Sequence, residues 1–161
     1  MRSTKSKHPT STCGIKGFFR VQLVDKKTRK IEGDSGWVQN VITNYGFASC
    51  LVGAPIQDAG SVLATGLSLG TGVAAIATSA TKLGSQAGAA SWYSTFGPAT
   101  VASLTARMTQ TFEGLAAISI AEIGVFAASN GTLIAGNTFD SSAMSTDQDV
   151  NCTYDLVYAR A

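Results

Sequence analysis

With 161 residues, the chain is long enough for one domain with a core of ordinary size, and no second domain is needed. Charged residues make up only 14%, against roughly 25% in ordinary soluble domains, so the surface has fewer charges than a free monomer usually shows. The three cysteines, Cys13, Cys50 and Cys152, are widely spaced and indicate neither a disulfide framework nor a zinc site.

Basic residues are concentrated at the start of the chain. The first thirty positions contain nine of the twelve Lys and Arg residues and one acid, a net charge of +8, whereas residues 31–161 carry three basic and nine acidic residues, a net charge of −6. This asymmetry predicts electrostatic contact with a partner, either nucleic acid or the acidic body of a neighbouring copy. We therefore expect a basic arm over residues 1–16 and a single domain over residues 17–161. The basic residues expected to bind the partner are Arg2, Lys5, Lys7, Lys16, Arg20, Lys26, Lys27, Arg29 and Lys30.

Neither a signal peptide nor a membrane span is predicted. The segment Met1–Thr12 is basic and polar but is not followed by an apolar segment of sufficient length. The uncharged stretch Ala59–Thr81 contains few large aliphatic residues, and its glycines would weaken a continuous helix.

The first half of the chain alternates short strand patterns with polar connections. In order, it is predicted to contain a strand over Gly17–Asp25, a polar hairpin connection over Lys26–Lys30, a return strand over Ile31–Val41, a short helix capped by Thr43 or Asn44 that stops at Gly53, a strand over Ser61–Leu69 and a long loop over Gly70–Ser91.

The second half predicts four strands, over Thr100–Phe112, Ala117–Ala127, Thr132–Phe139 and Asp149–Arg160, separated by turns that include Asp140–Ser142. The last strand has the clearest alternation, and its expected core face consists of Val150, Cys152, Tyr154, Leu156 and Tyr158. Many strands, one brief helix and no regular alternation of helix and strand predict an all-β fold, an antiparallel β-sandwich or jelly-roll-like barrel.

The sequence offers little for catalysis. The single histidine, His8, lies in the basic arm, so a nucleophile paired with histidine inside the domain is excluded. The carboxylates of Asp140, Asp147 and Asp149 lack the spacing of a calcium loop, and we interpret them as solvated. Leu69–Gly72 resembles a fragment of a phosphate-binding turn but is better explained as the end of a strand. We therefore predict no catalytic residue, cofactor site or metal site.

Three residues are expected to have structural roles. Trp37 and Trp92 are predicted to serve packing or subunit contact, with a stacking platform for bases or sugars as the alternative. Glu122 lies in the apolar run Ile118–Phe126, where an unpaired carboxylate is costly to bury. It should either emerge at a strand irregularity, made easier by Gly124, or accept hydrogen bonds from the backbone or from Arg107. A bulge near Glu122 would restore the inward-facing pattern.

Several ordered motifs carry a resemblance to a known family. They are residues 36–46 (Gly-Trp-Val-Gln-Asn-Val-Ile-Thr-Asn-Tyr-Gly), Leu69-Gly70-Thr71-Gly72 with Thr81-Lys82-Leu83, Phe112 followed by residues 120–126 (Ile-Ala-Glu-Ile-Gly-Val-Phe), and residues 131–139 (Gly-Thr-Leu-Ile-Ala-Gly-Asn-Thr-Phe). This succession resembles small virion proteins of tailed bacteriophages that are labelled tail fibre-like or uncharacterised structural proteins. The resemblance implies a β-rich, non-enzymatic building block that assembles in many copies on a phage particle, and it transfers no catalytic residues.

From these observations we expect a virion structural protein that is made in the cytoplasm of the bacterial host. Its partners would be copies of itself and other virion proteins, and a tail, adaptor or fibre position is favoured over capsid decoration. A nucleic-acid-binding module that uses the basic arm is a more distant alternative, because the body offers no basic face to continue the charge of the arm.

Overall fold

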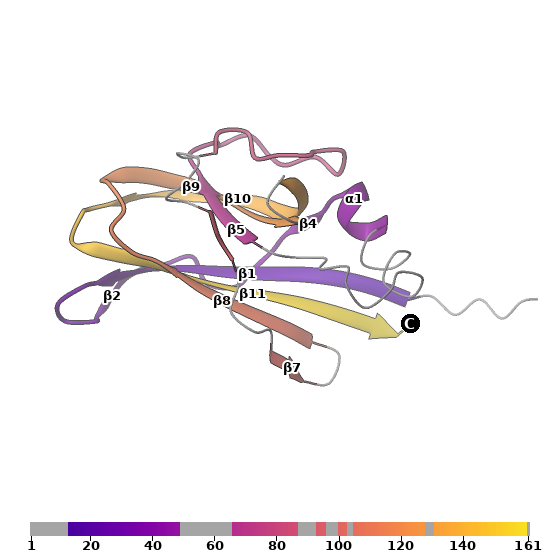
Figure 1. Ribbon diagram of the computed structural model, residues 1–161, viewed down its shortest axis with the longest axis horizontal. Coiled ribbons are helices and arrows are strands. Elements are labelled where there is room, and N and C mark those ends of the chain that lie inside the picture. The colour runs from indigo at the N-terminus through magenta and orange to yellow at the C-terminus, as the bar shows by residue number, and fades with distance from the viewer. Residues whose placement is uncertain are drawn as a thin grey trace, which may run out of the picture.

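The predicted all-β fold is confirmed: two antiparallel sheets pack face to face, with one short helix beside them (Figure 1). The computed structural model describes residues 13–48, 66–86, 93–95, 100–102, 105–127 and 131–160, and for residues 13, 93–95, 100–102, 159 and 160 it describes the backbone alone. Statements about the structure below refer to this part of the chain.

The first sheet, sheet A, contains both ends of the described chain. Its strand order is β2-β1-β11-β8-β7, and a short strand β3 also pairs with β1. The strands are β1 (Cys13–Asp25), β2 (Ile31–Asp34), β3 (Val38–Gln39), β7 (Thr100–Ala102), β8 (Thr105–Phe112) and β11 (Gln148–Arg160).

The second sheet, sheet B, packs across the inner face of sheet A and has the order β4-β10-β9-β5-β6. Its strands are β4 (Val41–Ile42), β5 (Gly66–Gly70), β6 (Tyr93–Thr95), β9 (Ile118–Ala127) and β10 (Thr132–Met144), and the helix α1 (Asn44–Phe47) follows β4. Thr43 caps this helix through its side chain, as expected, whereas the predicted continuation to Gly53 lies outside the described residues.

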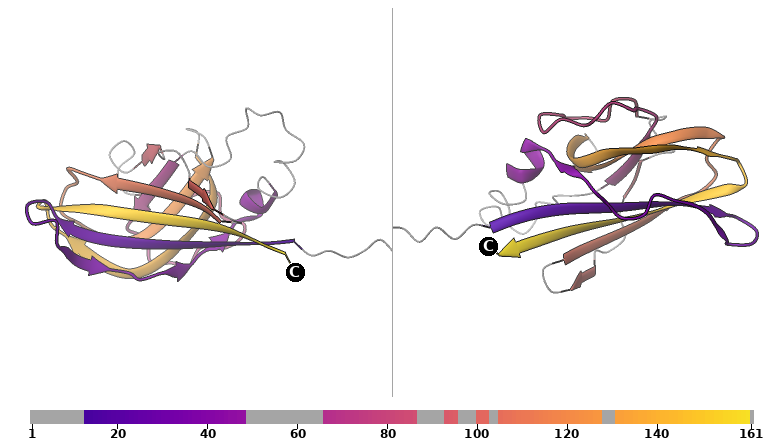
Figure 2. Two further views of the ribbon diagram at one scale, coloured as in Figure 1. Left: turned by 90° about the horizontal axis from the view of Figure 1, so that it is seen from below. Right: turned by 180° about the vertical axis from the view of Figure 1, so that it is seen from behind.

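The first and last strands pair along their whole length at the centre of sheet A. The register runs from Cys13 opposite Arg160 to Asp25 opposite Gln148, so the two ends of the described chain lie side by side at one end of the sandwich (Figure 2). Strand β1 therefore begins at Cys13 rather than at the expected Gly17, and residues 13–16 belong to the sheet. The basic arm that we expected over residues 1–16 is correspondingly shorter.

The core lies between the sheets, and the predicted inward face of the last strand is confirmed. Val150, Cys152, Tyr154 and Leu156 are buried, and Tyr158 is partly buried against the same core. Their neighbours across the sheet, such as Phe19 on β1 and Met108 on β8, are buried as well. Burial raises the pKa of the Cys152 thiol well above its usual value, so this cysteine behaves as a small hydrophobic residue.

Three predicted elements are corrected by the structure. The return strand over Ile31–Val41 is divided into β2, β3 and β4, because the chain leaves sheet A after Gln39 and joins sheet B at Val41. The strand over Thr100–Phe112 is instead two paired strands, β7 and β8. The turn expected at Asp140–Ser142 lies within β10, where the polar residues coincide with a shift of pairing register between Thr138 and Ser142, and the chain turns only after Met144.

Candidate functional site

The outward-facing side of sheet A forms a polar surface over β1, β11 and β8. Because side chains alternate along a strand, the residues between the buried ones point away from the core. They form what we call the sheet A face: Phe18, Arg20, Gln22, Asn151, Thr153, Asp155, Arg107, Thr109 and Thr111. Both arginines of this face, Arg20 and Arg107, are ion-paired within the chain.

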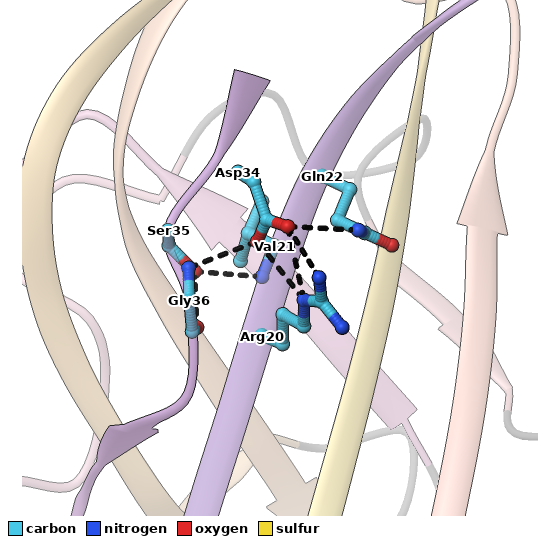
Figure 3. A network of polar contacts seen from close by, with 6 residues as sticks. All are labelled: Arg20, Val21, Gln22, Asp34, Ser35 and Gly36. Carbon is cyan, nitrogen blue, oxygen red and sulfur yellow. Dashed lines mark hydrogen bonds and ion pairs between the residues drawn. The ribbon is translucent and has the colours of Figure 1, made fainter. Parts of the chain in front are cut away.

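At one edge of the sheet A face, Arg20 on β1 forms an ion pair with Asp34 at the end of β2, the next strand in the chain (Figure 3). The Nε atom of Arg20 lies 3.0 Å from Oδ1 of Asp34, and one terminal nitrogen lies 2.5 Å from Oδ2. Gln22 and the backbone N–H of Gly36 donate to the same carboxylate, at 3.0 and 2.9 Å. The hydrogen bond from Arg20, with the other donors, lowers the pKa of Asp34 well below its usual value.

The backbone beside this ion pair is also tied down. Ser35 accepts a hydrogen bond from the backbone N–H of Val21 at 2.9 Å and donates to the carbonyl oxygen of Gly36 at 2.9 Å (Figure 3). Gly36 has a φ of +66°, a conformation that favours glycine. This turn sets the direction in which the chain continues to Trp37.

Arg107 links the middle of the sheet A face to Trp37. Its guanidinium donates two hydrogen bonds to Asp155, at 2.7 and 2.6 Å, and its central carbon lies 5.4 Å from the centre of the Trp37 ring. Asp155 is almost completely buried, whereas the Trp37 ring remains 46% exposed. The hydrogen bonds that Arg107 donates to Asp155 raise the pKa of Arg107 above its usual value. The Trp37 side chain therefore lies on the protein surface against Arg107 and is not part of the core.

Next to Arg107, the sheet A face is hollowed. The hollow has a volume of about 440 Å³ and is lined by Gln22, Thr109, Gln110, Thr111, Asn151, Cys152 and Thr153. Since Cys152 is buried, the accessible lining consists of hydroxyl and amide groups. Thr111 donates a 2.8 Å hydrogen bond to the side-chain oxygen of Asn151, which fixes the orientation of that amide. The hollow is thus polar, uncharged and spread over three strands.

Glu122 on β9 is fully buried. Its hydrogen-bond partners are backbone N–H groups, which were one of the predicted kinds of partner. Three N–H groups donate to its carboxylate, from Gly72 at 3.1 Å, Gly84 at 2.9 Å and Ser85 at 3.0 Å. The other predicted donor, Arg107, is bound to Asp155 instead. The carboxylate thereby pins both ends of the segment 71–86 to sheet B.

The register shift predicted near Glu122 is present. Glu122 lies opposite Thr138, while Ile120 lies opposite Ser142, so β10 contains the additional residues. Ile118 and Ile120 face the main core before the shift and Ile123 and Val125 face it afterwards. The shift restores the inward face, as proposed from the alternation in the sequence.

The glycines around Glu122 explain why the motif Leu69–Gly72 ends a strand. A Cβ atom on Gly72 would lie 2.4 Å from the carboxylate carbon of Glu122, and one on Gly70 would lie 2.5 Å from a carboxylate oxygen. Both distances are shorter than atoms tolerate, so glycine is needed to bring the backbone onto the carboxylate. Proximity to a buried acid, rather than phosphate binding, accounts for these glycines.

The segment 71–86 covers the outer side of sheet B, and residues 43–48, which include α1, lie next to this segment (Figure 1). Together we call residues 43–48 and 71–86 the sheet B cover. Ile76 and Leu83 of this cover pack on Phe126 and Leu133 of the sheet. The cover contains one charged residue, Lys82. Its exposed large apolar side chains are Tyr45 (45%), Phe47 (50%) and Val73 (78%).

Three of the basic residues expected to bind a partner are bound within the described part of the chain. Arg2, Lys5 and Lys7 lie outside the described residues, as do His8 and Trp92. Within the described part, Arg20 is paired with Asp34, Arg29 lies 2.9 Å from Asp149, and Lys26 donates to the carbonyl oxygen of Thr146. The remaining expected residues are the exposed Lys16, Lys27 and Lys30.

A cleft of about 310 Å³ opens between the two sheets where β2 faces the register shift of β10. Its lining combines apolar residues, such as Val21, Ile120 and Phe139, with polar residues that include Asp34 and Asp140. The carboxylate of Asp34 is already bound by Arg20, Gln22 and Gly36. Within the described ranges, no three His, Cys, Asp or Glu side chains are grouped as a metal site.

No protein family model, curated protein or solved structure matches this chain. Among the described residues, no helix is long and apolar enough to cross a membrane. The assignment of a function therefore depends on the surfaces of the sandwich described above.

Proposed function

We propose that this chain is a non-enzymatic structural protein of a tailed bacteriophage virion that assembles in multiple copies, in a tail, adaptor or fibre position. The observation that carries this proposal is the sheet B cover. It combines one charge, Lys82, with three exposed apolar side chains, Tyr45, Phe47 and Val73. Low charge and exposed aromatic residues are typical of the buried centre of protein–protein interfaces.

The cover is also held firmly enough to serve as an interface. Thr43 donates to the carbonyl oxygens of β10, and the backbone N–H of Asn44 donates to Thr78 at 2.7 Å, so α1 and the segment 71–86 are joined. Glu122 fixes the base of the same segment. A surface that is already ordered loses little conformational entropy when a partner binds.

The apolar contact is tested by measuring the oligomeric state of the protein. We expect the wild-type chain to associate with increasing concentration in sedimentation velocity experiments, and the Tyr45→Ser/Phe47→Ser variant to remain monomeric. The matched control is Ile31→Ser, which removes a side chain of equal exposure, 50%, from β2 in the other sheet. Association that survives the cover variant but is lost in the control would overturn this assignment of the interface.

The virion assignment needs a separate test. Immunogold labelling of particles purified from lysates of the bacterium that carries this gene should place the protein on the tail. Label on the head would favour the alternative of a capsid decoration protein, and particles without label would refute the virion assignment. Removal of residues 1–12 should reduce incorporation, because that segment carries Arg2, Lys5 and Lys7 for contact with an acidic neighbour.

The nucleic-acid alternative predicts a different behaviour. Binding through the basic segment would weaken steeply as the salt concentration rises, because condensed counterions are released from the phosphates. The internal ion pairs of Arg20, Arg29 and Arg107 make these three arginines less available for phosphate contacts, which favours the structural role.

A further inference from the structure

We propose that the hollow of the sheet A face binds a neutral saccharide. This inference concerns the opposite side of the sandwich from the sheet B cover, and it goes beyond the assembly function proposed above. It starts from two independent observations, a hollow lined by hydroxyl and amide groups and an exposed tryptophan held in place beside it.

The lining of the hollow matches the chemistry of sugar hydroxyl groups. Thr109, Thr111 and Thr153 offer hydroxyls that can both donate and accept, and Asn151 and Gln22 offer amides with both kinds of group. The Thr111 hydroxyl donates a hydrogen bond to the side-chain oxygen of Asn151, so the N–H₂ group of Asn151 remains as the donor for a ligand. Alternating donors and acceptors on a rigid sheet are suited to a polyol.

The charges around the hollow are neutralised, which argues against an ionic ligand. Arg20 is paired with Asp34 at one side, and Arg107 is paired with Asp155 at another. An anionic ligand would have to displace a carboxylate that makes two hydrogen bonds to its arginine. A phosphate or a strand of nucleic acid is therefore disfavoured, whereas a neutral ligand keeps both ion pairs intact.

Trp37 supplies the apolar contact that a sugar ring requires. Arg107 and Thr109 are successive outward-facing residues of β8, and Thr109 lines the hollow, so the contact between Arg107 and Trp37 places the indole ring on the same face of the sheet as the hollow. Trp37 is 46% exposed, and its ring lies against Arg107, a partly exposed arginine that is bound to the buried carboxylate of Asp155. The C–H face of a pyranose can pack on such an aromatic surface while its hydroxyls reach the threonines.

The experiment is a titration of the full-length, isotope-labelled protein with short neutral oligomers of glucose, galactose, mannose and N-acetylglucosamine, followed by two-dimensional amide NMR. At least one of these oligomers should shift the resonances of Thr109, Asn151 and Thr153 in a saturable manner. Asn151→Ala and Thr153→Val should each weaken that binding roughly tenfold, the effect of one lost hydrogen bond. Trp37→Ala should weaken it by a similar factor.

Thr78→Val is the matched control, because it removes an exposed hydroxyl from the sheet B cover and should leave binding unchanged. Thr153→Val keeps the shape of the side chain, so it tests the hydroxyl even if Trp37→Ala disturbs the fold. The proposal is overturned if none of the four oligomer types shifts these resonances, or if binding is insensitive to both Asn151→Ala and Thr153→Val. A failure here leaves the association test of Tyr45 and Phe47 unaffected, since that test concerns the other sheet.

Discussion

The carboxylate of Glu122 lies 2.9 Å from the backbone nitrogen of Gly84, a residue 38 positions earlier in the chain. With the bonds from Gly72 and Ser85, this contact closes the segment 71–86 over the outer side of sheet B. A buried carboxylate that accepts from three backbone N–H groups is among the stronger polar arrangements in a protein, and removal of the acceptor leaves all three donors without this partner.

We expect Glu122→Leu to lower the free energy of unfolding by at least about 3 kcal/mol, because three backbone N–H groups lose their acceptor. Glu122→Gln keeps one acceptor oxygen and should cost about 1 to 2 kcal/mol. Urea denaturation of both variants measures the difference. The leucine variant should also reduce the yield of assembled particles, while the glutamine variant should assemble. Equal stability of the two variants would contradict the hydrogen-bonding role.

Gly72→Ala should displace the segment 71–86, because the new Cβ would lie 2.4 Å from the Glu122 carboxylate carbon. We expect a loss of about 1 to 3 kcal/mol from overpacking, with faster amide hydrogen exchange at Gly84 and Ser85. Gly114→Ala is the matched control, since Gly114 has a φ of +66° and open space around its Cα atom. That variant should strain the backbone but leave exchange at Gly84 and Ser85 slow. Unchanged exchange in Gly72→Ala would be incompatible with the described contact.

Leu156→Ala should cost roughly 2 to 5 kcal/mol through lost burial and the cavity left behind. Leu156 is 8% exposed and lies on the inner face of β11, between β1 and β8. Val157→Ala, at the next and half-buried position, should cost under about 1 kcal/mol because its side chain points away from the core. A thermal or chemical denaturation series measures both variants. Equal losses would argue against the assigned orientation of the last strand.

Asp34 should make the stability of the protein dependent on pH in the acid range. The pKa of Asp34 is lowered in the folded state by Arg20, so its contribution is fully present above the unfolded pKa of about 4 and is lost as the pH falls through the lower folded value. Asp34→Asn should therefore flatten the decrease of Tm between about pH 5 and pH 2. Asp140→Asn, an exposed position on β10, is the control. Superimposable pH profiles of wild type and Asp34→Asn would disprove this coupling.

Much of the fold was accessible from local sequence patterns. The alternation of Val150, Cys152, Tyr154 and Leu156 identified a strand with one buried face, because side chains on a strand alternate strictly between its two sides. For Glu122, the isolated acid in an apolar run, the sequence predicted a nearby change of register and either emergence from the strand or hydrogen bonds from the backbone or Arg107, since an unpaired charge would be too costly to bury. The structure shows the change of register and the backbone partners. These conclusions depend only on residues close together in the chain.

Tertiary structure alone decided which distant segments meet. The segment Ile31–Val41 is divided between two sheets because β3 pairs with β1 and β4 pairs with β10. These pairings depend on strands outside the segment, so the local sequence of the segment does not predict them. The pairing of Arg20 with Asp34 and of Arg107 with Asp155 likewise follows from strand order, and it converts an apparently basic region into a nearly neutral face. The sequence by itself determined the buried face of the last strand and where charge is scarce, because these are properties of periodicity and composition. Only the folded chain determined that Trp37, Arg107 and the threonines of β8 and β11 share one surface, because long-range strand pairing brings them together.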